Sequence, residues 1–127
     1  MTTGGGRITA VTPQLRTTDI AKSIDFYTRK LGFALEFLHD DFYAGIRAGD
    51  SIFHLKLVDD ADPSIEYVDH GDHLHLYFQT TDVAAVARSL KERGVRLERD
   101  VHETAWATRE CVVKDDQGHT LYFGEPR

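Results

Sequence analysis

Four large aromatic side chains lie in parts of the sequence where a small molecule could stack on them. Tyr43, Tyr77, Trp106 and Tyr122 fall in or beside segments with the alternation of a β-strand. Flat rings bind planar or cationic groups through stacking and cation–π contacts. Trp106 is the strongest candidate, although a tryptophan at the start of a strand can equally fill a core. These residues predict a site for an aromatic or cationic ligand.

Imidazole and charged side chains occur in the same segments. His54 and His75 lie on the polar sides of two predicted strands, where each ring could serve a ligand or bond its neighbours. Glu110 could form an acid–base pair with His75 if the two meet across a cavity. Arg109 could bind an anionic group or neutralise nearby carboxylates. The predicted ligand-binding residues are therefore Trp106, His75, Tyr122, His54, Tyr43, Tyr77, Arg109 and Glu110.

The remaining reactive side chains indicate structure rather than chemistry. Cys111 is the only cysteine, and its alternation places it in the core, where an apolar thiol is inert. We expect His73 to bond its neighbours. Neither a nucleophile elbow nor a phosphate-binding glycine loop is present. We predict no catalytic residue. The other histidines, expected in turns or at exposed edges, are His39, His70, His102 and His119.

The composition and net charge of the chain limit the kinds of partner that it can bind. The chain has 127 residues, 41% of them apolar, which suits a single domain with its own core. A net charge of −6 argues against nucleic-acid binding. No apolar run approaches the roughly 20 residues that span a bilayer, and the first residues lack the apolar core of a signal peptide. We therefore expect a cytoplasmic protein without nucleic-acid or membrane partners.

Two similar motifs reveal how the chain is organised. TTDI begins at Thr17 and TTDV at Thr80, so the offset is 80 − 17 = 63 residues, about half the chain. Each motif is followed by a helical apolar stripe that ends at a glycine, Gly32 or Gly94. Asp19 and Asp82 are suited to cap these helices. A repeat of this length indicates one supersecondary unit used twice.

Around the helices the apolar period changes to two. The sequence therefore predicts an α+β domain over residues 1–127, with module one at 8–58, an acidic linker at 59–72 and module two at 73–124. Each module is βαβββ, with its helix on the apolar face of a mixed sheet. The polar face is either solvated or the lining of a cleft, and its aromatic and histidine side chains favour a cleft. The linker is either solvated or an acidic rim that attracts cations. The predicted strands are 8–17, 33–39, 42–48, 51–58, 73–81, 95–101, 107–114 and 119–124; Phe37, Phe42 and Phe53 are expected in the core.

The repeat, SIDFYTRKLGF after the first TTDI and KDDQGHTLYFGEP near the end resemble the vicinal oxygen chelate superfamily. That superfamily includes glyoxalases, extradiol dioxygenases and bleomycin-resistance proteins. Residues 106–110 and 123–126 are similar to the bleomycin-resistance branch in particular. The resemblance implies curved sheets around a cavity and a homodimer whose cavity is built from both chains.

The metal-using members of the superfamily hold one divalent ion with residues from four strands. Carried over to this sequence, those positions are Thr12, His54, His75 and Tyr122. His54 and His75 are thus the only candidate metal ligands. Such sites need a carboxylate or another strong third ligand besides two histidines, and neither of the other two positions supplies one. Glu110 could supply a carboxylate from a neighbouring strand. We therefore predict no cofactor.

The resemblance leads to three alternatives. The first is a metal-independent binding protein that sequesters an aromatic or cationic compound, and so confers antibiotic resistance. The second is a metal-dependent lyase, isomerase or dioxygenase that uses His54, His75 and one divalent metal ion. The third is a dimeric interaction module with a vestigial cleft. We favour the first.

Overall fold

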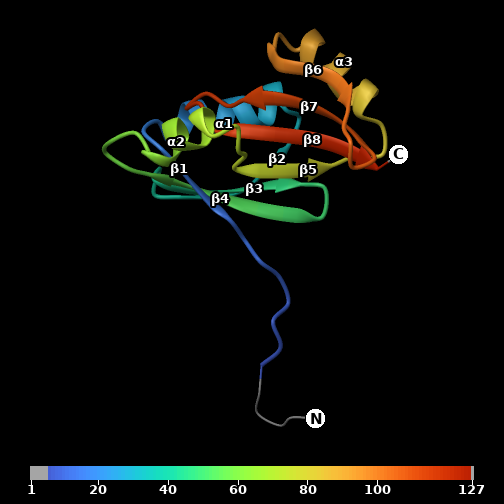
Figure 1. The fold of residues 1–127 in the computed structure, drawn as a ribbon. Helices are drawn as coiled ribbons and strands as arrows, with labels where there is room; N and C mark the ends of the chain where they lie inside the picture. Colours follow the sequence, from blue (N-terminus) through green and yellow to red (C-terminus); the bar gives the residue numbers. More distant parts are fainter. Residues whose placement is uncertain (1–5, 127) are drawn as a thin grey trace.

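The computed structural model describes residues 6–126, which form an α+β fold with two four-stranded sheets (Figure 1). In the first half, β1 (Gln14–Thr17) is followed by α1 (Ile20–Asp25) and a π-helical turn, η1 (Phe26–Lys30). Then come β2 (Ala34–His39), β3 (Tyr43–Ala48) and β4 (Ser51–Leu57). The second half contains α2 (Ser64–His70), β5 (Leu76–Gln79), α3 (Val83–Glu92), β6 (Leu97–Glu103), β7 (Thr108–Lys114) and β8 (Thr120–Pro126).

Both sheets have the same topology. Their strand orders are β1-β4-β3-β2 and β5-β8-β7-β6, and neither sheet closes into a barrel. In each, the first strand runs parallel to the last and the other pairs are antiparallel. This order confirms the predicted repeat of a βαβββ module and the mixed sheets.

The repeated Asp residues act as helix caps. The Oδ1 atoms of Asp19 and Asp82 accept from the backbone N–H groups of Lys22 and Ala85, both at 3.0 Å. The closing glycines, Gly32 and Gly94, have φ values of 78° and 81°, where a Cβ atom would be strained. Both helix boundaries were therefore readable from the sequence.

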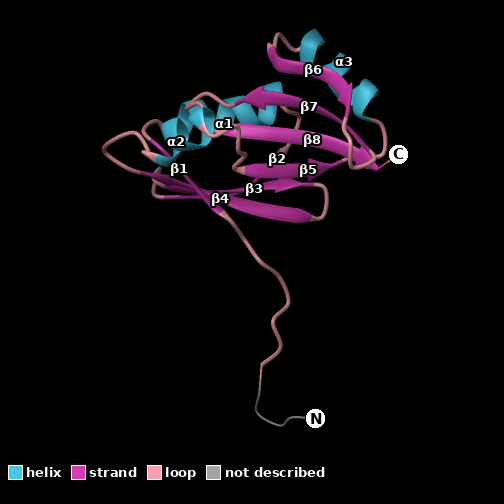
Figure 2. Cartoon of the chain, viewed as in Figure 1, coloured by secondary structure: helices cyan, strands magenta, loops and turns pink. Residues whose placement is uncertain are grey.

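The two modules share one core. Phe78 of β5 lies 5.1 Å from Phe33 and 6.0 Å from Phe53 between ring centroids, so aromatic contacts cross from one module to the other. α1 packs against β3 and β4, and α3 packs against β6, β7 and β8 (Figure 2). Cys111 is fully buried in this core, as predicted.

The turn between β7 and β8 fastens module two to the first helix. Asp115 accepts a hydrogen bond from the Tyr27 hydroxyl at 2.6 Å, and Asp116 accepts one from Ser23 at 2.7 Å. His119 donates its Nδ1–H to Asp115 at 2.7 Å and is only 1% exposed. The prediction of an exposed His119 was wrong, because the turn folds back onto α1 instead of projecting into solvent.

Several other expectations need correction. The 59–72 segment is not a plain linker: it contains α2, which packs against β8 and is held by the Lys114–Asp69 ion pair at 2.5 Å. β1 begins at Gln14 rather than residue 8, and the segment before Pro13 runs away from the sheets (Figure 1). Phe53 is buried, but Phe37 and Phe42 are about 40% exposed because they lie on the outer hairpin of β2 and β3. Within residues 6–126 no helix is long and apolar enough to cross a membrane.

Candidate functional site

The polar face of module two carries a buried carboxylate. Glu110 of β7 is 2% exposed, and its Oε2 atom accepts from the Tyr77 hydroxyl at 2.8 Å and from Thr108 at 3.0 Å. Among the described residues, no hydrogen bond reaches its Oε1 atom and no cationic side chain is within salt-bridge distance. The Glu110 side chain therefore keeps one oxygen available in a nearly dry position.

A glycine makes this arrangement possible. Gly124 of β8 lies opposite Glu110 in the sheet register, and the Tyr77 ring folds across the space above it. A Cβ atom on Gly124 would lie 1.9 Å from the Tyr77 oxygen and 3.2 Å from the Glu110 Cγ atom. Glycine within a strand signals such a close approach. That signal, and the alternation of Thr108 with Glu110, were present in the sequence but missed.

Glu110 lines a hollow of about 680 Å³ on this face. Two predicted aromatic residues line it as well: Tyr122, which is half-buried, and Trp106, which is 69% exposed in the turn before β7. Trp106 is thus not a core plug. The other members of the lining come from β6 and from the segment after α2, and include Arg99, His102 and His73.

The two phenols at this site are held in their neutral form. Burial and the hydrogen bond to Glu110 raise the pKa of Tyr77 above its ordinary value. Burial, together with the negative charges of Asp72 and Glu110, raises the pKa of Tyr122. Both hydroxyls therefore stay protonated near neutral pH, where they serve as hydrogen-bond donors and not as bases.

The polar face of module one has a different chemistry. The Tyr43 hydroxyl is 2.9 Å from Nδ1 of His54 and accepts from the Gln14 amide at 3.0 Å. Phe37 covers Gly45, and its ring centroid is 5.4 Å from that of His54. This face is an aromatic surface without a buried carboxylate. Tyr43 and His54 do not line the hollow that holds Glu110.

His75 does not share the face that carries Glu110. The backbone N–H of Thr120 donates to its Nδ1 atom at 3.0 Å, so Nε2 carries the hydrogen and faces Ser64 at 3.1 Å. Burial and the neighbouring His119 lower the pKa of His75, which keeps the ring neutral. Because both ring nitrogens are engaged under α2, the structure does not pair His75 with Glu110.

Arg109 also lies apart from the hollow. It alternates with Glu110 along β7, so the two side chains point to opposite faces. Its Nε atom is 3.6 Å from Glu103 in a partly exposed ion pair. Of the eight predicted ligand-binding residues, the structure therefore brings together Trp106, Tyr122, Glu110 and Tyr77, and places His54 and Tyr43 together elsewhere.

The register of the strands changes the set of positions that would hold a metal. β1 pairs Gln14 with His54, and β5 pairs Tyr77 with Tyr122. Thr12 precedes β1, and His75 is turned toward α2. Gln14 therefore occupies the position that was assigned to Thr12, and Tyr77 occupies the position that was assigned to His75. One imidazole, one amide and two phenols are a poor set for a divalent ion. In residues 6–126 no three His, Cys, Asp or Glu side chains are grouped to hold a metal ion.

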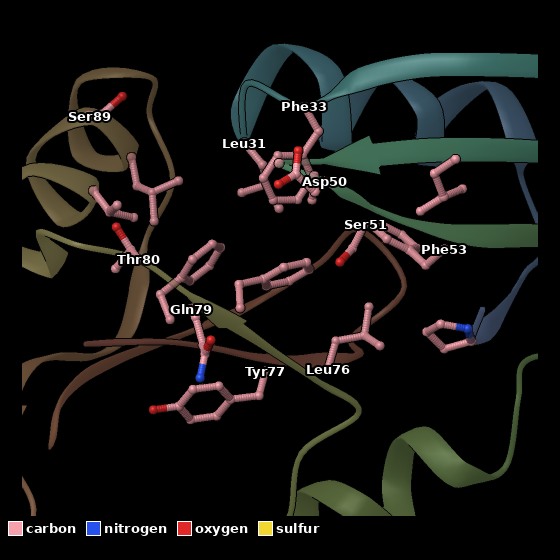
Figure 3. A pocket seen from close by; sticks show the side chains of 18 of the residues that line it. Leu31, Phe33, Asp50, Ser51, Phe53, Leu76, Tyr77, Gln79, Thr80 and Ser89 are labelled. Atoms are coloured by element: carbon pink, nitrogen blue, oxygen red, sulfur yellow. The ribbon is translucent and has the colours of Figure 1, made fainter. Parts of the chain in front are cut away.

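A second cavity, of about 810 Å³, lies between the modules (Figure 3). Its walls include Leu31, Phe33 and Phe53 from module one and Leu76 from β5, together with polar residues such as Ser51. Tyr77 stands at its edge beside Gln79 (Figure 3). Tyr77 thus lines this groove with its ring while its hydroxyl reaches Glu110 in the hollow. Unlike the hollow, the groove has no buried carboxylate among its described lining residues.

Comparison with known proteins agrees with this architecture. The sequence profile described as the Glyoxalase/Bleomycin resistance protein/Dioxygenase superfamily matches residues 7–123. The chain belongs to this superfamily. The fold, with its two βαβββ modules and open sheets, is that of the vicinal oxygen chelate proteins. No curated protein matches the chain.

Solved structures share the fold at low identity. The bleomycin-binding protein of bleomycin-producing Streptomyces verticillus, complexed with copper(II)-bleomycin, is 21% identical with a TM-score of 0.74 and coverage of 97% of this chain and 100% of that one. A glyoxalase-related enzyme from Clostridium phytofermentans is 18% identical, with a TM-score of 0.78 and coverage of 98% and 100%. A superfamily member from Alicyclobacillus acidocaldarius is 16% identical, with a TM-score of 0.77 and coverage of 93% and 91%. At these identities the likeness shows the fold alone.

Proposed function

We propose that this superfamily member is a metal-independent binding protein that sequesters a small aromatic or cationic compound in the cytoplasm. The observation that carries the proposal is the hollow of about 680 Å³, where Trp106 and Tyr122 offer flat surfaces beside the buried Glu110. Stacking surfaces around one oriented polar group are typical of a small-molecule site.

The chemistry of the hollow favours binding over reaction. Its hydroxyl groups remain protonated, and Glu110 is engaged with Tyr77 and Thr108 rather than with a nucleophile. The single thiol lies on the opposite, apolar face, where burial raises the pKa of Cys111 to about 11. His75 is occupied under α2. A ligand would therefore meet groups that hold it in place.

Sequestration also fits one relative of the same fold. The Streptomyces verticillus protein binds copper(II)-bleomycin. By extension, we propose that this chain confers resistance by binding a toxic compound without altering it. The metal-dependent alternative is weaker, because Gln14, His54, Tyr77 and Tyr122 do not form a metal-binding set.

The proposal includes a homodimer. In residues 6–12, which extend away from the sheets, Ile8 and Val11 are 90% and 87% exposed. The β2–β3 hairpin exposes further apolar side chains: Leu35, Phe37, Leu38 and Phe42. Large exposed apolar areas mark interaction surfaces. A second copy of the chain would cover them and complete the open faces of the sheets. Sedimentation of the protein and of a Leu35→Asp/Leu38→Asp variant tests this, and a monomeric wild type contradicts it.

The single tryptophan provides the test of ligand binding. A panel of planar neutral and cationic compounds is titrated while Trp106 fluorescence is followed, with free N-acetyltryptophanamide as the control for unspecific quenching. We expect saturable quenching that EDTA leaves unchanged, and mass spectrometry that recovers the bound compound unmodified. Absence of quenching across the panel contradicts binding in this hollow. Chelator-sensitive turnover would favour the metal enzyme.

A further inference from the structure

We infer that Glu110 is the anchor for a cationic nitrogen, so that the ligand carries a protonated amine or amidine on a planar ring. This inference rests on the proposed function. It assigns the charge recognition to one buried carboxylate and not to the acidic 59–72 segment, whose side chains are mostly exposed.

The first argument is the state of the Glu110 side chain. It is 2% exposed, and its two hydrogen bonds, from Tyr77 and Thr108, both reach the Oε2 atom. Within residues 6–126 no Lys, Arg or His lies within ion-pair distance. Buried charges in proteins are paired, because an unpaired one loses its hydration without replacement. A cationic ligand in the hollow would supply the missing partner.

The second argument is positioning. The Tyr77 hydroxyl can reach Oε2 only because Gly124 leaves the space above the sheet empty. With Oε2 held by two donors, Oε1 is the atom left to accept from a ligand in the hollow that Glu110 lines. Carboxylates bind N–H cations through charge-assisted hydrogen bonds, so a quaternary ammonium or a neutral amide would satisfy Oε1 less well.

The third argument is the surrounding charge. Arg99 lines the same hollow, but it is exposed on β6, where water screens its repulsion. Asp72, which also lines the hollow, adds a negative charge. Trp106 and Tyr122 provide the flat surfaces on which the ring that carries the cation would stack.

The experiment compares benzamidine with benzamide, which has the same ring and planar group but no charge. Chemical-shift titration of the isotope-labelled protein gives both affinities. We expect benzamidine to bind about 10- to 100-fold more tightly, the range of a charge-assisted hydrogen bond. In Glu110→Gln, we expect this preference to fall to within about threefold. The matched control is Glu66→Gln on α2, which removes the same charge from an exposed position and is expected to retain the preference.

The outcomes separate the two levels of the proposal. Equal binding of both probes to the wild type overturns the cation assignment and leaves small-molecule binding intact. An equal loss in Glu66→Gln and Glu110→Gln overturns the role of Glu110 in favour of the acidic segment. Failure of both probes to bind contradicts this inference. Binding of neutral compounds, followed by Trp106 fluorescence, tests the proposed function separately. The wild-type comparison decides the charge preference even if Glu110→Gln does not fold.

Discussion

The two modules share a frame but differ in the faces they present. In both, an Asp caps the helix and a glycine closes it. On each sheet an aromatic ring covers a glycine, but on strands that are not equivalent: Phe37 of β2 over Gly45 of β3, and Tyr77 of β5 over Gly124 of β8. On the first face the ring is apolar and its neighbours are Tyr43 and His54. On the second face the ring is a phenol that donates to the buried Glu110.

This difference shows which positions of a duplicated module can diverge. Caps and closing glycines are set by backbone geometry, which both copies need. Side chains on the polar face take no part in capping or closing the helices, so they can differ between the two copies. Module two carries the buried carboxylate of Glu110, and its β7–β8 turn bonds to α1 and η1 of module one. The predictions below test this asymmetry.

The largest effect is expected at Asp115. Its Oδ1 atom accepts from the N–H groups of Gln117, Gly118 and His119, and its Oδ2 atom accepts from Tyr27 and His119. In Asp115→Asn, the NH₂ group of the new side chain would face N–H or O–H groups that also donate, and the buried negative charge would be lost. We expect the free energy of unfolding to fall by about 3–5 kcal/mol. Urea denaturation measures this loss of stability. Asp50→Asn in the exposed β3–β4 turn of module one should change stability by less than about 0.5 kcal/mol. Equal effects would refute the asymmetry.

The same residue gives a pH dependence. Burial by itself raises the pKa of Asp115, but the hydrogen bonds and charge of His119 and the Tyr27 hydroxyl outweigh it, so the net pKa is lowered. A lowered folded pKa stabilises the native state above the unfolded value of about 4 and loses this contribution as the pH falls below it. Stability measured from pH 6 down to pH 2 should fall more steeply in the wild type than in Asp115→Asn. Parallel curves would contradict this.

The glycines under the two rings come next. Gly124→Ala and Gly45→Ala would bring a Cβ atom to 1.9 Å from the Tyr77 oxygen and 2.3 Å from a Phe37 ring carbon. We expect each to cost about 1–3 kcal/mol in thermal or urea denaturation, because the ring must move. In a Tyr77→Ala background the Gly124→Ala cost should nearly vanish. A cost that persists there would place its cause in the backbone.

The caps test the symmetric part of the comparison. Asp19→Ala and Asp82→Ala each remove one side-chain acceptor from the first turn of a helix. Both should lower the free energy of unfolding by about 1 kcal/mol, and by similar amounts. A loss at one site only would show that the two capping sites are not equivalent in energy.

The smallest effect concerns Cys111. Burial raises its pKa to about 11, so at pH 8 the thiol is protonated and shielded. A colorimetric thiol reagent should therefore leave native protein unmodified and react fully after unfolding in urea. Rapid reaction in the native state would show that this strand of module two opens.

The frame was readable from sequence, and parts of the site were not. The two helices could be predicted from their capping residues, Asp19 and Asp82, and their closing glycines, Gly32 and Gly94. Capping depends only on neighbours within a few residues. Glu110, Trp106, Tyr77 and Tyr122 were named as ligand-binding candidates, and the structure gathers them at one end of module two. The prediction for His119 failed because the ring packs on His75 and bonds to Asp115, which Tyr27 of η1 also contacts, and both His75 and Tyr27 lie far away in the chain.

What the sequence determined by itself was the repeat, the caps, the alternation of each strand and the apolar set that forms the core, since all of these are local patterns. Only the tertiary structure decided the register that places Tyr77 beside Tyr122, and the contact of the His75 ring with α2. It also decided that Gly124 leaves room for Tyr77 to reach Glu110. A shift of register is invisible in composition, yet it determines which side chains meet, because strand pairing joins residues far apart in sequence.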